Sequence, residues 1–243
     1  MKNDYSYSED EILFKKVNQL LRSIKCEYWV CHGTLLGIIR DNMILPWDHD
    51  IDFAVWKKKV KTEDIEKLFK DSGFKQEIIL GEMDCLHFTN GSKKIDISFY
   101  DVKDNVASVR WVVIKKTNLK NKFLNFIAMI IHSLDNNIVI DLEIKNIKDL
   151  LKFLLIKVTK LIKQFIKKNT RKKIYEDAIK SFYYTGYSYD INLMKFKNII
   201  FLDEVVPVPI DSEKCLEITY GKDWRVPKKN YVWYNEANNL INM

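Results

Sequence analysis

The residues most able to do chemistry lie in one short stretch, where three aspartates, Asp48, Asp50 and Asp52, are spaced two apart. Apolar Ile51 and Phe53 alternate with these acids. That alternation predicts a strand with Asp50 and Asp52 on one face. Neighbouring carboxylates repel each other unless a positive charge lies between them, and a hard divalent cation with oxygen ligands is suited to supply it. The spacing therefore predicts a Mg²⁺ site, with Mn²⁺ as the alternative ion.

A candidate phosphate-binding element precedes the acids. Gly33 and Thr34 form a small-residue turn at the start of a predicted helix. A helix N-terminus offers free backbone N–H groups to an anion. The helix ends in Arg40, which could balance the charge of a pyrophosphate or instead pair with Asp48 or Asp52. Metal, phosphate and arginine together indicate phosphoryl transfer from a nucleotide.

A third carboxylate follows on another predicted strand. Asp96 alternates with Ile95 and Ile97, so its side chain is expected on the opposite face from theirs. Acids on a surface strand can simply be solvated, but an acid on a neighbouring strand favours a metal site. Asp96 would complete the ligand shell or take the proton from an attacking hydroxyl. For Asp48 the sequence leaves two roles open, as a metal ligand or as a residue that positions the strand.

Three motifs together carry a family resemblance. They are Gly-Thr-Leu-Leu-Gly-x-x-Arg followed by Pro-Trp-Asp-x-Asp-Ile-Asp, the Ile-Asp-Ile strand, and a late Tyr-Gly-x-x-Trp-x-x-Pro. In this combination the sequence resembles the LicD and fukutin-related family of phosphotransferases, a branch of the polymerase-β-like nucleotidyltransferase superfamily. The matching blocks cover roughly residues 28–56, 94–100 and 203–228, and the first is the most specific. His49 is a departure, because many bacterial members have another acid there.

The resemblance implies an activity and a set of roles. A CDP-activated alcohol, such as CDP-choline, CDP-ribitol or CDP-glycerol, would donate its phospho-alcohol to a hydroxyl of a cell-surface glycan, and CMP would leave. The glycan would belong to a capsule, a lipooligosaccharide or a teichoic acid, and could be linked to a lipid. Asp50 and Asp52 would bind magnesium with Asp96 as third ligand or base, while Gly33 and Thr34 would hold phosphate.

The elements that must position these residues indicate an α+β fold, in which a nucleotidyltransferase-like mixed sheet is flanked by helices and carries a helical insert. The expected boundaries are 1–114 for the catalytic core, 115–200 for the insert, and 201–243 for a segment that packs back on the core. Ser8 and Glu11 predict a capping box ahead of the first helix. The remaining expected elements are strands over 28–32, 50–55, 74–80, 85–89, 94–100 and 107–114, and helices over 10–25, 33–40 and 61–72.

The expected insert has a composition of its own. From 115 to 180 it contains no Gly or Pro, and over 151–168 its apolar residues recur at helical spacing with lysines mostly off the apolar stripe. Two interpretations remain open: the stripe packs on the core with the lysines in water, or the helix lies on an anionic membrane leaflet.

Charge and composition narrow the function classes. The 243 residues carry a net charge of +7, which favours an anionic partner. The four cysteines form no CxxC pair, which favours a reducing compartment. The N-terminus is too polar for a signal peptide, and the longest apolar run is too short to span a bilayer. We therefore expect a cytoplasmic protein, peripheral at the inner face of the membrane if it binds one.

Two other functions compete with phosphotransfer. An Asp-x-Asp glycosyltransferase would use a nucleotide sugar and manganese, but it would place a longer α/β half before the acids. A non-catalytic basic adaptor for a membrane or a nucleic acid would not require the three strand aspartates to converge. Nucleic acid is not expected as a partner, because RNP-type aromatic motifs and a helix-turn-helix signature are missing.

Overall fold

The structure is a computed structural model, and it describes residues 7–77, 84–90, 93–114, 119–135, 147–180 and 182–241. The chain divides into two compact units. The first comprises Met1–Gln76, Asp84–Trp111 and Thr185–Asn242, and the second comprises Glu77–Met83 and Val112–Tyr184 together with Met243.

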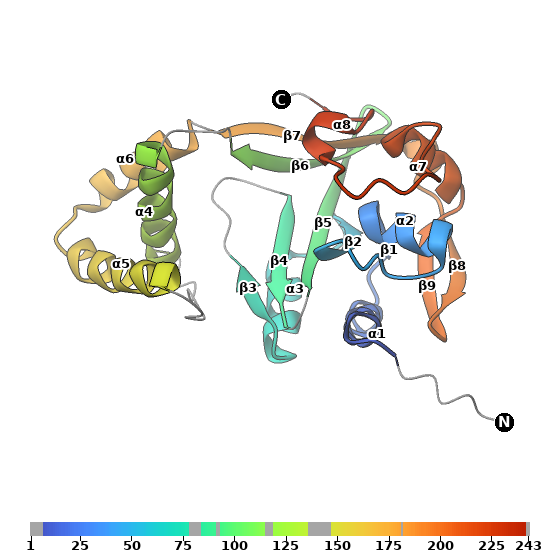
Figure 1. Ribbon diagram of the computed structural model, residues 1–243, viewed down its shortest axis with the longest axis horizontal. Helices are drawn as coiled ribbons and strands as arrows, with labels where there is room; N and C mark the ends of the chain where they lie inside the picture. The colour runs from blue at the N-terminus through green and yellow to red at the C-terminus, as the bar shows by residue number, and fades with distance from the viewer. Residues whose placement is uncertain are drawn as a thin grey trace. The chain divides into compact units, whose positions relative to one another are not determined.

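One mixed sheet positions the predicted site residues (Figure 1). Its strands are β1 (Tyr28–Val30), β2 (Asp50–Trp56), β3 (Lys75–Glu77), β4 (Cys85–Thr89), β5 (Lys94–Lys103), β6 (Val106–Ile114) and β7 (Phe182–Asp190). The order is β1-β2-β5-β4-β3, and β6 pairs with β5 and β7. β2 runs parallel to β5 with Asp52 opposite Asp96, and antiparallel β4 places His87 opposite Asp96. Asp52, Asp96 and His87 therefore form one row across the sheet.

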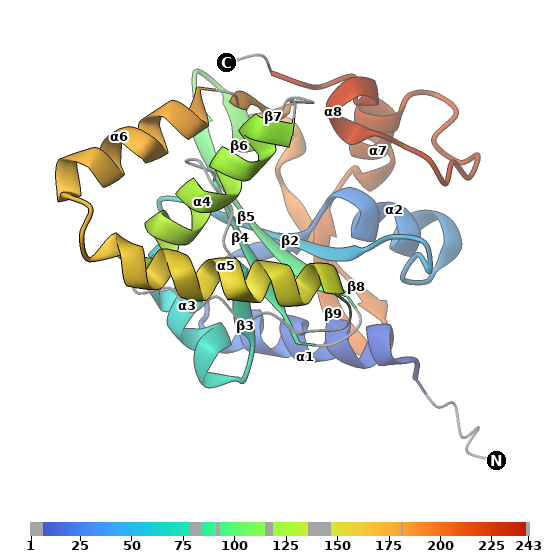
Figure 2. The same ribbon diagram turned by 60° about the vertical axis from the view of Figure 1, so that its left-hand side comes forward.

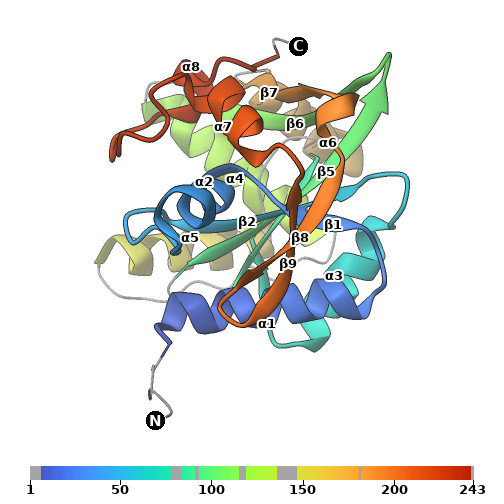
Figure 3. The same ribbon diagram turned by 90° about the vertical axis from the view of Figure 1, so that its right-hand side faces the viewer.

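Helices and a separate hairpin complete the first unit. They are α1 (Glu9–Ser23), α2 (His32–Asp41), α3 (Thr62–Asp71), the 3₁₀ turn η1 (Ile191–Leu193), the hairpin β8 (Phe196–Phe201) and β9 (Glu204–Pro209), α7 (Ser212–Tyr220) and α8 (Trp233–Glu236). The Ser8 hydroxyl accepts from the Glu11 backbone N–H, and the Glu11 carboxylate accepts from the Ser8 backbone N–H; this capping box confirms the predicted start of α1. Figure 3 shows α1 beside β9, where Asn18 Nδ2 donates to the Val205 carbonyl over 3.2 Å.

Apolar packing in the core fixes the register of β2. Ile51, Phe53 and Val55 are fully buried between the helices and the sheet, and Phe53 stacks on Phe14 of α1 with ring centroids 5.3 Å apart. A one-residue slip of β2 would bring these side chains to the other face and the aspartates into the core. Apolar burial therefore sets which face of β2 carries the acids.

Within its described residues, the second unit has three helices, which Figure 2 shows. They are α4 (Leu119–Asp135), α5 (Ile147–Lys163) and α6 (Lys168–Ile179). Asp135 at the end of α4 links the three helices, because its carboxylate pairs with Lys163 of α5 at 2.8 Å and with Arg171 of α6 at 3.0 Å. None of the helices in the described part of the chain has the length and apolar content that a bilayer crossing needs.

Most expected elements are present, with ends that differ by a few residues. The main difference is in the expected insert over 115–200, whose helices end at Ile179. Its last part forms β7 and β8, because the run beginning Phe182-Tyr183-Tyr184-Thr185 is aromatic and β-branched, and such residues favour a strand. Residues 78–80 of the expected third strand lie outside the described residues.

Candidate active site

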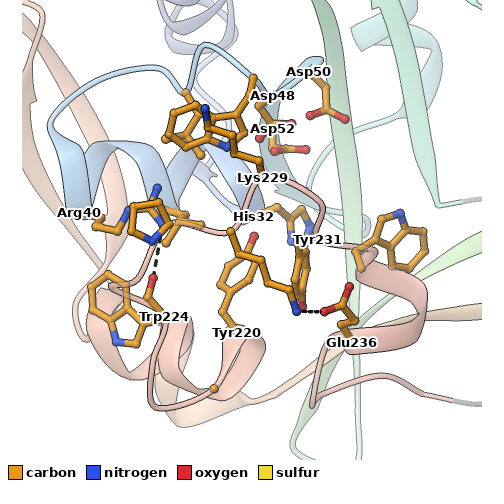
Figure 4. Close-up of a pocket in the computed structure, with 18 of the residues that line it drawn as sticks. His32, Arg40, Asp48, Asp50, Asp52, Tyr220, Trp224, Lys229, Tyr231 and Glu236 are labelled. Atoms are coloured by element: carbon orange, nitrogen blue, oxygen red, sulfur yellow. Dashed lines mark hydrogen bonds and ion pairs between the residues drawn. The ribbon is translucent and has the colours of Figure 1, made fainter.

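The three closely spaced aspartates converge. Asp48 lies in the loop before β2, Asp50 begins the strand and Asp52 is two residues along it, and one carboxylate oxygen from each lies within 4.8 Å of the others. Figure 4 shows the three side chains gathered on one side of a cavity. Asp48, whose role the sequence left open, thus joins the two strand acids.

The electrostatics of this trio favour a bound cation. Burial, followed by repulsion from Asp48 and Asp96, raises the pKa of Asp50 to about 8. Burial and repulsion from Asp50, Asp48 and Asp96 hold the pKa of Asp52 well above its usual value. Protonation of the carboxylates would relieve this repulsion. A divalent cation would relieve it while the carboxylates stay ionised. Three hard oxygen donors that reach one point fit Mg²⁺ or Mn²⁺.

Two residues hold Asp48 in the trio. The Lys93 side chain is buried, and its ammonium donates to the carbonyls of Leu45 (3.0 Å) and Asp48. Gly33 leaves room for the carboxylate, because a side-chain carbon at this position would collide with Asp48 Oδ2. Lys93 therefore braces the loop that carries Asp48.

Thr34 holds Asp52. Its Oγ1 accepts from the Asp52 backbone N–H over 2.7 Å, and its own N–H and hydroxyl lie 3.4 Å from Asp52 Oδ2. The side chain is buried behind the acid, whereas Gly33 lines the cavity. The phosphate contacts predicted for Gly33 and Thr34 stay predictions, and the contact observed for Thr34 is with Asp52.

Asp96 lies beside Asp52 but belongs to a different group. Its Oδ1 is 2.7 Å from His87 Nδ1, and Cys85 completes a cluster of three possible ligands within 4.8 Å. Burial holds the pKa of the Cys85 thiol well above its usual value, which disfavours the thiolate that binds metals. The role expected for Asp96, as third ligand or base with Asp50 and Asp52, stays a prediction; the structure groups Asp48 with the two strand acids and gives Asp96 a histidine partner.

Arg40 lines the cavity, but its charge already has a partner. Its guanidinium pairs with Asp41 at 2.7 Å and donates to the Trp224 carbonyl over 3.4 Å, as Figure 4 shows for the second contact. The alternative partners considered from sequence were Asp48 and Asp52. The role of Arg40 toward a pyrophosphate stays a prediction.

The cavity has a volume of about 690 Å³, within the usual range of ligand pockets. The C-terminal motif reaches it through Tyr220 and Trp224. Lys229, whose ammonium lies 5.5 Å from the centre of the Trp47 ring, also lines it. Sequence reasoning missed Lys229, although its place two residues after Pro227 of the motif was a usable signal.

His32 and Trp111 bring unsatisfied polar atoms to the cavity lining. Burial lowers the pKa of His32 to about 3, so its ring is neutral, and it stacks on Tyr187 with centroids 4.3 Å apart. His32 Nδ1 and Trp111 Nε1 are buried without a hydrogen-bond partner. Buried polar groups are nearly always bonded, so these two atoms are candidates to contact a ligand or an ordered water.

Comparison with known proteins agrees with the motifs. Residues 25–131 match the LicD/FKTN/FKRP nucleotidyltransferase domain, and this match includes the trio and Asp96. This segment is a LicD-type nucleotidyltransferase domain. The LicD match leaves out the C-terminal block at 203–228 and extends beyond the expected boundary at 114, into α4.

Sequence relatives of this chain give no further function. The uncharacterized protein RT0683 of Rickettsia typhi is 30% identical over 101 residues, which are 38% of this chain and 33% of that protein. The uncharacterized protein RP689 of Rickettsia prowazekii is 32% identical over 63 residues, which are 26% of this chain and 24% of that protein. The chain thus spans a third or less of these curated relatives.

Similar solved structures include the lincosamide antibiotic adenylyltransferase LnuA in its lincomycin-bound form. The TM-score is 0.41 at 11% identity, over 87% of this chain and 86% of that one. ANT(2")-Ia in complex with adenylyl-2"-tobramycin gives a TM-score of 0.33 at 15% identity, over 41% of this chain and 55% of that one. Both likenesses are weak, and the family assignment therefore relies on the sequence match.

Proposed function

We propose that this LicD-type transferase uses Mg²⁺ to move a phospho-alcohol, such as phosphocholine, glycerol phosphate or ribitol phosphate, from a CDP-activated donor to a hydroxyl of a cell-surface glycan. The observation that carries the proposal is the convergence of Asp48, Asp50 and Asp52 at the edge of a cavity that Lys229 and Arg40 also line. Carboxylates for a cation beside basic side chains are the combination that a pyrophosphate requires.

Each group has a role in this proposal. The trio would hold Mg²⁺, which when bound neutralises charge on the phosphate oxygens of the donor. Lys229 extends over Trp47 and would contact a donor phosphate. Asp96 would accept the proton of the attacking hydroxyl, with His87 fixing the orientation of its carboxylate. The attack would break the bond between the transferred phosphorus and the CMP oxygen.

The rest of the cavity suits the organic parts of the donor and acceptor. Its aromatic lining offers flat apolar faces to a cytosine or a sugar ring, while the unpartnered nitrogens of His32 and Trp111 offer hydrogen bonds to polar atoms. We place the reaction in the cytoplasm, at the inner face of the membrane if the glycan is lipid-linked.

Thermal unfolding tests the donor class. CDP-choline, CDP-glycerol and CDP-ribitol would be compared with UDP-glucose, each with and without Mg²⁺. The correct donor should raise Tm only when Mg²⁺ is present, since a ligand that binds the folded state at 100 times its Kd adds about 2.7 kcal/mol. Stabilisation by the UDP-sugar alone would favour a glycosyltransferase, and no shift with any CDP compound would contradict the proposal.

A further inference from the structure

Helix α5 of the second unit displays apolar side chains to solvent. Leu151 is 59% exposed, Leu161 is 65% exposed, and Phe165 just past the helix is 81% exposed. They continue a row at helical spacing that we name the α5 stripe. Its members are Ile147, Leu151, Leu154, Val158, Leu161 and Phe165. A row of this size in water is unusual for an isolated soluble domain and marks an interaction surface.

The stripe is not the face that α5 uses within its own unit. Thr159 is only 6% exposed, and Lys163 pairs with Asp135 of α4. Leu155 is half-buried on the same side of the helix as these two residues. α5 therefore meets α4 through one face and leaves the stripe on another.

From residue 150 onward, the charges beside the stripe have a single sign. Between 150 and 170 the chain has no Asp or Glu. It has six lysines there: Lys152, Lys157, Lys160, Lys163, Lys167 and Lys168. All of these except Lys163 are exposed. Leu and Phe on one face with lysines at its margins is the composition of a helix that lies in a membrane interface.

We infer that the α5 stripe docks on an anionic lipid surface, with the apolar side chains among the acyl chains and the flanking lysines at the headgroups. A second copy of the chain would bring two sets of lysines together without acids to oppose them, which is unfavourable. A nucleic acid would satisfy the lysines but leave the leucines and Phe165 in water. Only an anionic lipid surface satisfies both the charge and the apolar area.

The inference is independent of the proposed donor chemistry, because it depends on α5 and not on the aspartates. If both hold, docking would bring the protein to the surface where a lipid-linked acceptor is found. Loss of membrane binding would leave turnover of a soluble acceptor unchanged, so the two proposals can fail separately.

Vesicle flotation of the full chain tests the inference. Vesicles of phosphatidylcholine with 30% phosphatidylglycerol should carry the protein at low salt, and binding should fall as salt rises because the lysine contribution is screened. Vesicles of pure phosphatidylcholine should carry little. Absence of binding to the anionic vesicles at low salt would overturn the inference.

Two variants separate the charge from the apolar side chains. The triple change Lys157→Glu, Lys160→Glu and Lys167→Glu should lower the partition coefficient at least a hundredfold, because each lysine near an anionic surface contributes about 1 kcal/mol. Leu154→Glu with Leu161→Glu should also abolish flotation, although all six lysines remain.

A matched control changes the same charge elsewhere. Lys67→Glu, Lys70→Glu and Lys197→Glu alter three exposed lysines of the first unit and should reduce binding much less. Equal loss in the control would mean that net charge, and not α5, directs binding. A dimer in sedimentation that Leu154→Glu with Leu161→Glu dissociates, or a fall in Tm of that variant, would show that protein covers the stripe, and would also overturn the inference.

Discussion

Asp52 and Asp96 lie side by side in one row of the sheet, but their surroundings are opposite. Asp52 has two acids as neighbours, Asp48 and Asp50, and repulsion adds to burial in raising its pKa. Asp96 has His87 Nδ1 at 2.7 Å, a hydrogen-bond partner that the protein itself supplies. Asp52 thus belongs to a group of repelling acids that favours a cation, whereas Asp96 already has a hydrogen-bond partner within the protein.

The difference shows how the site is built. The candidate cation site uses a loop residue and two of the first three residues of one strand; Lys93 binds that loop and Gly33 leaves room for its carboxylate. The neighbouring strand contributes a carboxylate whose orientation a histidine sets. We therefore propose separate groups for metal binding and for proton transfer, and the following experiments test that separation.

Removal of a trio carboxylate should have the largest effect. Asp52→Asn should reduce turnover about a thousandfold or more, because a charged metal ligand is lost. In the absence of metal the same variant should unfold at an equal or higher temperature, since a buried repulsion is removed. Donor turnover and thermal unfolding without Mg²⁺ measure the two effects.

The control for this change is Asp101→Asn, on the same sheet but paired with Lys58 at the surface. It should leave turnover unchanged. Full activity in Asp52→Asn would contradict both the site and the proposed function.

Gly33→Ala should come next, because the added methyl group collides with Asp48. We expect the Mg²⁺ dissociation constant to rise about 10- to 100-fold, as when a group that supports metal ligands is lost. Gly73→Ala is the matched control: Gly73 has φ +84° and open space around it, so alanine should lower stability by about 1 kcal/mol without changing Mg²⁺ affinity. Unchanged Mg²⁺ affinity in Gly33→Ala would mean that Asp48 is not a ligand.

His87 tests the second half of the comparison. His87→Ala should lower kcat about 10- to 100-fold with little change in Mg²⁺ affinity, because Asp96 loses the partner that orients it. His87→Asn should restore much of kcat, since its amide nitrogen can take the place of Nδ1. If His87→Ala weakens Mg²⁺ binding as strongly as Gly33→Ala does, Asp96 belongs to the metal site and the separation is wrong.

The last test is the pH dependence of stability without metal. Asp50 has a pKa of about 8 in the folded protein against about 4 when unfolded, so the folded state binds the extra proton between these values. Stability should therefore fall as pH rises from about 4 to about 8. Mg²⁺ should reverse the trend, because it replaces the proton. Tm from pH 5 to 8.5, with and without Mg²⁺, measures this, and Asp50→Asn should flatten the metal-free curve.

Local patterns already predicted much of the fold. The capping box at Ser8, the alternation in β2 and β5 and the turn at Gly33 depend on neighbours a few residues apart, and the structure contains them. The boundaries of the expected insert stay a prediction, but its last part forms strand β7, because the aromatic and β-branched run from Phe182 favours a strand. The family match confirms the resemblance that the motifs carried.

The sequence by itself determined that Asp50 and Asp52 share a face, because side chains alternate along a strand whatever surrounds it. Only the tertiary structure decided which third acid joins them. Asp48 enters the trio because Lys93, 45 residues away, binds its carbonyl, and Asp96 is drawn to His87 by the pairing of β4 with β5. The same holds for α5, whose stripe is periodic in sequence but whose exposure depends on which face packs against α4. Contacts between distant residues carry no local signal, and they decide which charges are paired and which need a ligand.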